Sequence, residues 1–237
     1  MKAENILALA SELRLALDPD GIHKRPETLD KLKEINKVIP GNPITLVSMI
    51  IAECEEEIQQ ARLKKGGRTK AFKTAKKIIK SARDSFPARK EWHYPQEQDG
   101  FQYFTSGIIV MKIKEPFPFE NAPADVIGPR DLASKYYQYT EQCTQEILDI
   151  PNTADIAAFI KKSKSESTEK QPLIDWRFNC GLLVNAEHLL DAMETLNTSA
   201  LWAYTDADHT RLYLKTGDEG ALVFGRRRID RRISPAQ

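Results

Sequence analysis

The segment from Thr69 to Phe86 constrains the fold most, because its apolar and basic residues recur at the spacing of two opposite helix faces. One face carries Phe72, Ala75, Ile78, Ile79 and Ala82, and the other carries Lys70, Lys73, Lys76, Lys77, Lys80 and Arg83. Apolar residues three and four positions apart line one side of an α-helix. The segment is therefore expected to be a surface helix that buries one side against a core and presents the other side to solvent or to a partner.

Charge is strongly segregated along the chain, although the net charge is only +1. Residues 64–90 contain 11 basic residues and a single acidic one, Asp84. Residues 91–225 carry a net charge of −10, and the tail from residue 226 carries a net charge of +4. The small net charge is therefore the sum of strongly positive and strongly negative segments of the chain.

The basic helix face predicts contact with a polyanion. Neutralising phosphates with lysine and arginine releases counterions and gives salt-sensitive binding that does not depend on sequence. The candidate nucleic-acid-binding residues are Lys70, Lys73, Lys76, Lys77, Lys80 and Arg83. The alternative is a face that pairs with an acidic protein surface, including the acidic remainder of this chain, since charge alone does not name the polyanion.

The order of elements predicts a helical first part and a second part rich in antiparallel strands. Helices are expected at 3–17, 27–38, 43–63, 131–149 and 185–196, in addition to the basic helix. Strands are expected at 91–98 and 101–113 around an Asp99-Gly100 turn, and at 172–182, 201–206, 211–216 and 221–226. The Pro-rich stretch 114–129 and the polar stretch 163–170 are expected to be irregular.

The helix at 185–196 has the clearest local signals. Asn185 is a good N-cap residue because its side-chain oxygen can accept backbone N–H groups of the first turn. Leu189, Leu190, Met193 and Leu196 recur at helical spacing. This helix is therefore expected to dock through one apolar face.

Sequence motifs for catalysis, cofactors or metals are absent. The TDADHT stretch at 205–210 imitates the nucleophile loop of aspartate-dependent phosphatases, but too little chain follows for the parallel sheet of that fold, so Asp206 and Asp208 are assigned to a hairpin turn. The four histidines and three cysteines show no metal-ligand spacing. The KYYQY cluster at 135–139 could stack bases or pack in a core, and packing is favoured. A non-enzymatic protein without a cofactor is predicted.

Composition favours a soluble protein of a reducing compartment. Apolar residues make up 41% of the 237 residues, which can supply a normal core. The apolar runs are too short for a signal peptide or a membrane span, and the odd number of separated cysteines predicts no disulfide framework. A cytoplasmic location is expected, with no membrane partner.

Two segments resemble the bacterial DNA polymerase III beta subunit, the sliding clamp. VNAEHLLDAMETL, followed by ALWAYTDADHTRLYLKTGDEGALVFGRRR, is similar to the clamp helix and its three closing strands, while FQYFTSGIIVMKIK is similar to the clamp strands that carry a Thr-Asp-Gly turn, with Ser106 in place of Asp. The whole chain also resembles uncharacterised prophage-type proteins of Gram-positive bacteria that carry such a module after a helix. The resemblance spans residues 69–228.

The sequence and the resemblance together predict an α+β protein. A helical N-terminal segment, 1–67, is expected to precede one clamp-like module, 68–230, of antiparallel strands with two packed helices, and a basic tail, 231–237. In clamps such modules form a ring with basic helices facing DNA, so the resemblance implies a DNA-associated accessory function in replication. The expected partners are DNA, or an acidic protein surface, or a second copy of the chain.

Overall fold

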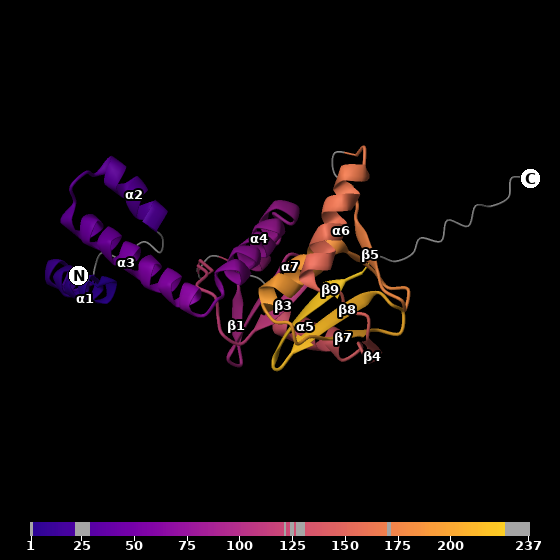
Figure 1. Cartoon of the computed structure of the whole chain (residues 1–237). Helices are drawn as coiled ribbons and strands as arrows, with labels where there is room; N and C mark the ends of the chain where they lie inside the picture. The colour runs from indigo at the N-terminus through magenta and orange to yellow at the C-terminus, as the bar shows by residue number, and fades with distance from the viewer. Residues whose placement is uncertain are drawn as a thin grey trace, which may run out of the picture. The chain divides into compact units, whose positions relative to one another are not determined.

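The computed structural model of the chain divides into two compact units, Met1–Thr69 and Lys70–Gln237 (Figure 1). The described residues are 2–21, 29–120, 122–123, 126, 131–169 and 172–225. The start of the helix predicted at 27–38, and the tail from residue 226, lie outside them. Each unit is described by itself below.

Unit 1 is helical, as the sequence predicts. It contains α1 (Ala3–Leu17), α2 (Leu29–Val38) and α3 (Pro43–Lys65). Asn42 caps α3, because its side-chain oxygen accepts hydrogen bonds from the backbone N–H groups of Ile44 and Thr45, and Pro43 occupies the first turn, where its missing N–H costs nothing. Both α1 and α2 pack against α3.

Unit 2 is an α+β structure built on an antiparallel sheet. Its first half consists of α4 (Thr69–Ser85), the 3-10 turn η1 (Lys90–His93), β1 (Gln96–Gln98), β2 (Phe101–Thr105) and β3 (Ile109–Ile113). Then follow α5 (Leu132–Thr140), β4 (Gln145–Ile147), α6 (Thr153–Glu166), β5 (Asp175–Arg177) and β6 (Leu183–Asn185). The unit closes with α7 (Ala186–Leu196), β7 (Trp202–Thr205), β8 (Arg211–Thr216) and β9 (Glu219–Phe224).

The main sheet has seven strands in the order β1-β2-β3-β9-β8-β7-β4, and β5 and β6 form a separate hairpin. Helix α4 is followed by the meander β1-β2-β3, and helix α7 is followed by the meander β7-β8-β9. The two meanders join where β3 pairs with β9, with Met111 opposite Ala221. A helix followed by three antiparallel strands thus occurs twice, and the two last strands lie side by side at the middle of the sheet.

Helices cover both faces of this sheet. Tyr103, Val110 and Leu222 point toward α5 and form a buried cluster with Leu132 and Tyr136. Their sequence neighbours point to the opposite face, since successive strand residues alternate. On that face Phe104 lies against Phe117 and Phe119, which also contact Phe72 of α4. Figure 1 shows α4, α7 and α6 on this side.

Several predicted boundaries are confirmed. Asn185 caps α7 by accepting hydrogen bonds from the N–H groups of Glu187 and His188. Asp99 and Gly100 both have positive φ and join β1 to β2, as an Asp-Gly hairpin turn requires.

The stretch predicted as strand through Ile113 contains a second turn at Ser106, whose hydroxyl accepts hydrogen bonds from the N–H groups of Ile108 and Ile109.

The middle of the chain differs most from the prediction. The helix predicted at 131–149 ends at Thr140, because residues 145–147 form β4 and pair with β7. Residues 163–166 belong to α6, a helix that the polar composition concealed. The strand predicted at 172–182 is short, since the chain turns after Phe178 and returns as β6. Unit 2 therefore contains more than the two helices expected.

Candidate nucleic-acid interface

Helix α4 is the surface helix that its sequence predicts. Ala71, Phe72, Ala75, Ile78, Ile79 and Ala82 are all buried, with at most 4% of any residue exposed. The six basic residues singled out from the sequence are exposed on the remaining surface of the helix. Their contacts divide them into three groups.

Lys70 and Lys77 form ion pairs with the neighbouring helix α7. The Lys70 ammonium lies 2.9 Å from a carboxylate oxygen of Glu194, and the Lys77 ammonium lies 2.8 Å from one of Asp191. The Thr74 hydroxyl adds a hydrogen bond of 3.1 Å to Glu194. These two lysines therefore hold α4 against α7.

Asp191 makes Lys77 a structural residue. Only 7% of Asp191 is exposed, and burial raises the pKa of its carboxyl above the ordinary value, although the hydrogen bond and the charge of Lys77 oppose this rise. A carboxylate that is costly to bury depends on a cationic partner, which Lys77 supplies here. Substitution of Lys77 would therefore disturb the fold, so Lys77 is unsuited to a test of binding.

Lys73, Lys76 and Lys80 form the outward-facing group, called the outer lysines below. All three are exposed, and none forms an ion pair with a carboxylate of a described residue. Lys76 lies over the Phe72 ring, with its ammonium 4.5 Å from the ring centroid. From Lys73 to Lys80 the helix advances about 10 Å, so the outer lysines lie close together on one ridge.

Arg83 forms the third group. Its guanidinium donates to the backbone carbonyl oxygen of His93, at 3.3 Å from Nε and 3.2 Å from Nη2. It also lies over the Tyr94 ring at 5.4 Å. Arg83 thus braces the end of α4 against the following segment, and it remains exposed to solvent.

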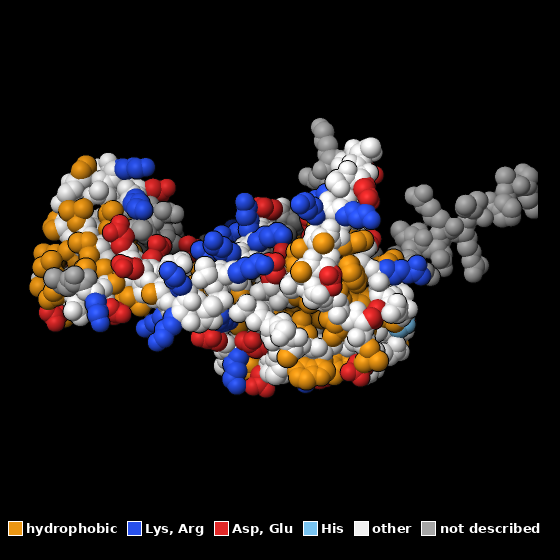
Figure 2. Space-filling model, in the orientation of Figure 1, with side chains coloured by type: hydrophobic (Ala, Val, Ile, Leu, Met, Phe, Trp, Pro, Cys, Tyr) orange, Lys and Arg blue, Asp and Glu red, His pale blue; other side chains and the backbone are white. Residues whose placement is uncertain are grey.

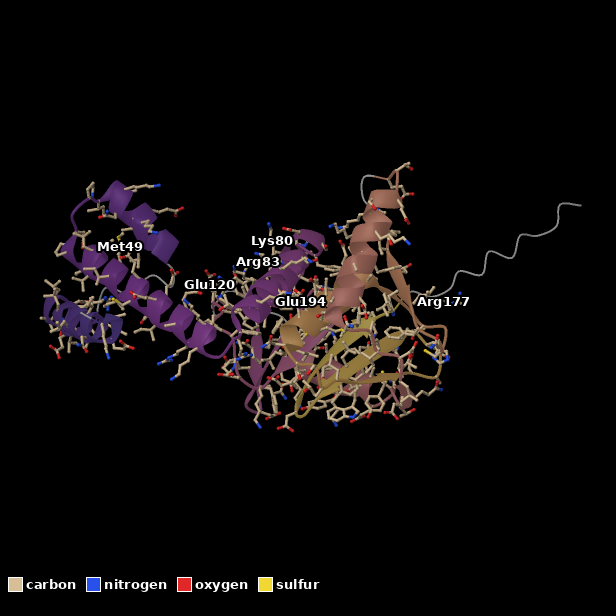
Figure 3. All side chains as sticks on the ribbon, viewed as in Figure 1. Met49, Lys80, Arg83, Glu120, Arg177 and Glu194 are labelled. Atoms are coloured by element: carbon tan, nitrogen blue, oxygen red, sulfur yellow. The ribbon has the colours of Figure 1, made fainter. Side chains whose placement is uncertain are left out.

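Helix α6 adds basic residues that the sequence analysis missed. Lys161, Lys162 and Lys164 are exposed, and Lys164 pairs with Glu187 of α7 at 2.6 Å, which lowers the pKa of that carboxyl. Figure 2 shows basic side chains gathered over α4 and along α6, and Figure 3 shows Lys80 and Arg83 on α4. The Asn152 cap, whose oxygen accepts from the Asp155 N–H, is the sequence signal that could have identified α6.

The acids of α7 are already paired. Glu187, Asp191 and Glu194 bind Lys164, Lys77 and Lys70, respectively. These carboxylates are therefore not available to neutralise the outer lysines, which leaves an excess of positive charge on this face of unit 2.

Asp206 stabilises the turn of the β7–β8 hairpin through hydrogen bonds. Its carboxylate accepts hydrogen bonds from the backbone N–H and the hydroxyl of Thr210, and from the backbone N–H and guanidinium of Arg211, at 2.6–3.1 Å. Asp208 is exposed in the same turn. The phosphatase-like stretch is thus a polar hairpin turn, as predicted.

The tyrosine cluster at 135–139 packs mainly inside the protein. Tyr136 is 1% exposed and belongs to the cluster under α5, and Tyr139 meets the Phe224 ring edge-on. Tyr137 is 40% exposed and forms a hydrogen bond of 3.3 Å with Tyr103. This cluster covers the sheet face opposite α4, so it does not contribute stacking rings beside the outer lysines.

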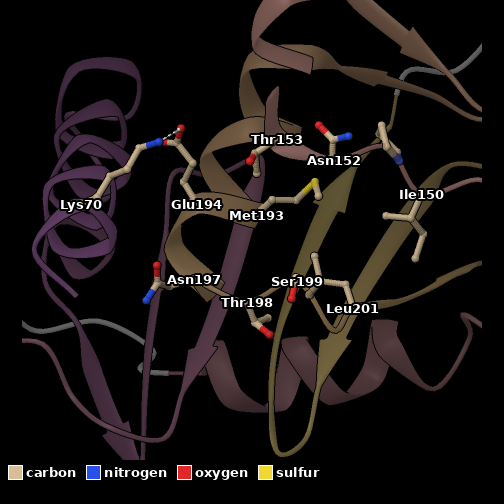
Figure 4. Close-up of a pocket in the computed structure, with 11 residues that line it drawn as sticks. Lys70, Ile150, Asn152, Thr153, Met193, Glu194, Asn197, Thr198, Ser199 and Leu201 are labelled. Atoms are coloured by element: carbon tan, nitrogen blue, oxygen red, sulfur yellow. Dashed lines mark ion pairs between the residues drawn. The ribbon is translucent and has the colours of Figure 1, made fainter. Parts of the chain in front are cut away.

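A cavity of about 560 Å³ lies between the end of α7 and the start of α6 (Figure 4). Its lining includes Met193, Asn197, Asn152 and Leu201. The charged residues in this lining are Lys70 and Glu194, which pair with each other at 2.9 Å. The described residues that line this cavity therefore do not include a set of titratable side chains suited to acid–base catalysis.

Metal-ligating side chains do not cluster in the part of the chain that the structure describes, where no group of three His, Cys, Asp or Glu residues lies together. Within the same residues, every helix is too short or too polar to cross a membrane. No known family model matches the chain, and neither a curated protein nor a solved structure shows significant similarity to it.

Proposed function

We propose that unit 2 binds DNA through phosphate contacts from the outer lysines, and that the protein is a non-enzymatic, DNA-associated accessory protein. One observation carries this proposal: Lys73, Lys76 and Lys80 are exposed and lack a carboxylate partner among the described residues, although acidic side chains lie on the adjacent helix. Lysines in such a position attract phosphates, and the release of counterions from DNA makes this binding favourable.

The clamp-like character of unit 2 belongs to the same proposal. A module of this kind needs a basic helix and antiparallel strands behind it, and the succession of α4 and β1-β2-β3, then α7 and β7-β8-β9, supports that architecture. In the proposed arrangement α4 faces DNA and α7 anchors α4 through the pairs of Lys70 and Lys77. A replication-accessory role of phage or prophage type follows from the resemblance to clamps.

Reversing the outer lysines tests this proposal. The variant Lys73→Glu/Lys76→Glu/Lys80→Glu is expected to bind a fluorescent duplex of about 20 base pairs at least 100-fold more weakly than the natural protein near 50 mM salt, because three phosphate contacts are lost. Fluorescence anisotropy gives both affinities. Lys77 is left unchanged so that Asp191 keeps its partner.

The matched control reverses three exposed lysines elsewhere: Lys33→Glu/Lys37→Glu/Lys90→Glu. It changes the net charge by the same amount, so a nonspecific charge effect would weaken both variants equally. The proposal requires the control to keep its affinity within about threefold. Equal losses in the two variants would show that α4 is not the binding surface.

The second candidate function is the recognition of an acidic protein surface. It is favoured by the two lysines of α4 that already bind carboxylates of α7. Poly-L-glutamate is a simple probe of this alternative. The second function would be favoured if the natural protein binds poly-L-glutamate through the outer lysines. Its affinity for the duplex would then be no higher than for poly-L-glutamate when the two polymers are compared at the same concentration of negative charges.

A further inference from the structure

Helix α6 lies beside α7 on the side opposite to α4 (Figure 1). Asp191 of α7 pairs with Lys77 of α4, whereas Met193, about 160° away around the helix axis, lines a cavity together with the first residues of α6. At the other end of α6, Lys164 pairs with Glu187 in the first turn of α7. Helix α6 therefore runs in the opposite direction to α7.

Helix α4 also runs in the opposite direction to α7. Lys70, at the start of α4, pairs with Glu194 near the end of α7, and Lys77, two turns later, pairs with Asp191. The helices α4 and α6 thus point the same way on the two sides of α7. Helices that pack side by side lie about 10 Å apart, so the axes of α4 and α6 are about 20 Å apart.

Two lysines of α6 lie on the flank that faces α7. Lys164 is on this flank because its ammonium lies 2.6 Å from a carboxylate oxygen of Glu187. Lys161 precedes Lys164 by three residues and is about 60° away around the helix axis, so it lies on the same flank. Both side chains are exposed, and no ion pair joins Lys161 to a carboxylate of a described residue. Lys161 and Lys164 are called the α6 row below.

Lys162 lies on the other flank of α6, about 160° from Lys164 around the helix axis. It follows Phe159 by three residues, and the Phe159 ring meets the Trp176 ring of β5 edge-on at 5.2 Å. Lys162 is exposed, as Lys161 is, but it faces away from α7. The two neighbouring lysines therefore form a matched pair for testing the side of α6 that binds a ligand.

Three carboxylates separate the α6 row from the outer lysines. Glu187, Asp191 and Glu194 lie within about 60° of one another on α7, on the side away from its buried leucines. The charge across this surface therefore changes from positive on α4 to negative on α7 and back to positive on α6. Because carboxylates repel phosphates, a polyanion that binds both lysine groups needs two rows of phosphates with a gap over α7.

A DNA duplex has this pattern of charge. Its two strands carry one row of phosphates each, and the major groove between the rows is about 12 Å wide. The long side chains of the lysines can span the remaining difference from the helix spacing. A single strand carries one row of phosphates, so it can occupy only one of the two lysine groups.

We propose that the α6 row is a second phosphate-binding site, so that a DNA duplex lies across α7 with one strand against the outer lysines and the other strand against Lys161 and Lys164. This inference rests on the proposed binding of DNA by the outer lysines. Lys161 contacts phosphate directly, whereas Lys164 exchanges the Glu187 carboxylate for phosphate. The side chains of Lys164 and Glu187 are 52% and 43% exposed, and an ion pair at this exposure adds little stability.

The substitution Lys161→Glu tests the α6 row by fluorescence anisotropy. It is expected to weaken binding of a duplex of about 20 base pairs at least 10-fold near 50 mM salt, because a phosphate contact is replaced by a repulsion. The matched control Lys162→Glu makes the same charge change one residue later and is expected to keep the affinity within about twofold. The natural protein is expected to bind the duplex at least about 10-fold more tightly than a single strand of the same length. Circular dichroism checks that each variant is folded.

The substitution Glu187→Gln tests the exchange of partners by Lys164. It is expected to raise the affinity for the duplex about fivefold and to make the salt dependence steeper by about 0.9, because Lys164 gains a phosphate contact. In a Lys164→Gln background, Glu187→Gln is expected to change neither quantity. A weaker long-range repulsion alone would raise the affinity equally in both backgrounds.

The outcomes separate the α6 row from DNA binding itself. The α6 row is overturned if Lys161→Glu keeps the natural affinity or if Lys162→Glu weakens binding as much as Lys161→Glu does. It is also overturned if the single strand binds as tightly as the duplex, or if Glu187→Gln acts equally with and without Lys164. In each of these cases, a loss of affinity on reversal of the outer lysines would leave the proposed function intact. A natural protein without affinity for the duplex would overturn both.

Discussion

Replacing Gly107 with alanine is expected to destabilise unit 2 by about 2–4 kcal/mol, through backbone strain and a steric clash. Gly107 has φ of +86° in the turn between β2 and β3, a region that residues with a Cβ rarely adopt. A Cβ at this position would lie 2.9 Å from Cδ2 and Cζ of Phe86 and still closer to Cε2. The Phe86 ring packs edge-on against Trp92 at 5.3 Å, so it cannot withdraw freely.

Urea unfolding followed by tryptophan fluorescence measures this effect in unit 2, which contains all three tryptophans. The control is Gly100→Ala, at φ of +77° with no atom near its Cβ position, and it should lose only the backbone part, about 1 kcal/mol. In a Phe86→Ala background, Gly107→Ala should cost no more than Gly100→Ala does. If the loss stays the same in that background, the proposed clash with Phe86 is wrong.

Replacing Asp206 with alanine is expected to destabilise the same unit by about 2–3 kcal/mol, because a partly buried guanidinium and two backbone N–H groups lose their acceptor. Asp206 is 3% exposed and ties Thr210 and Arg211 to the start of the β7–β8 turn. The neighbouring substitution Asp208→Asn should change the free energy of unfolding little, since Asp208 is exposed. Urea unfolding of the two variants gives this comparison.

The contribution of Asp206 should also depend on pH. Burial opposes ionisation of Asp206, but the hydrogen bonds from Thr210 and Arg211, with the Arg211 charge, outweigh it and lower the pKa of this carboxyl below the ordinary 3.8. A lowered folded-state pKa means that the stabilisation is present above 3.8 and is lost as the pH falls through the folded-state value. The natural protein and Asp208→Asn, which both keep Asp206, should therefore approach the stability of Asp206→Ala in strong acid. A stability difference from Asp206→Ala that stays constant down to strong acid would contradict this assignment.

Local rules predicted those elements whose signals lie within a few residues. The Asn185 cap, the Asp99-Gly100 turn and the two-faced α4 all follow from spacing and side-chain chemistry, and the structure confirms them. Strand β4 could not be predicted in this way. Its residues Gln145 and Glu146 are ordinary helix residues, and they become a strand only because Tyr204 and Thr205 of β7 lie opposite.

The candidate site was only partly predictable for a similar reason. The sequence identified the basic face of α4, yet it could not separate Lys70 and Lys77 from the outer lysines, because that division depends on where α7 lies. Helix α6 was missed because its last residues, 163–166, belong to a polar stretch that was assigned as irregular, although the buried Ile156 and Ile160 lie four residues apart at helical spacing. The structure therefore changed the candidate set from one helix face to the outer lysines, with further lysines from α6.

The salt dependence of duplex binding tests the central claim most directly. In anisotropy titrations from about 50 to 200 mM salt, the logarithm of the association constant should fall linearly with the logarithm of salt concentration, and reversal of Lys73, Lys76 and Lys80 should make the slope shallower by about 3, or 0.9 for each phosphate contact. A natural protein with no affinity for the duplex at 50 mM salt, or with a slope that the reversal leaves unchanged, would contradict the proposal that these lysines bind DNA.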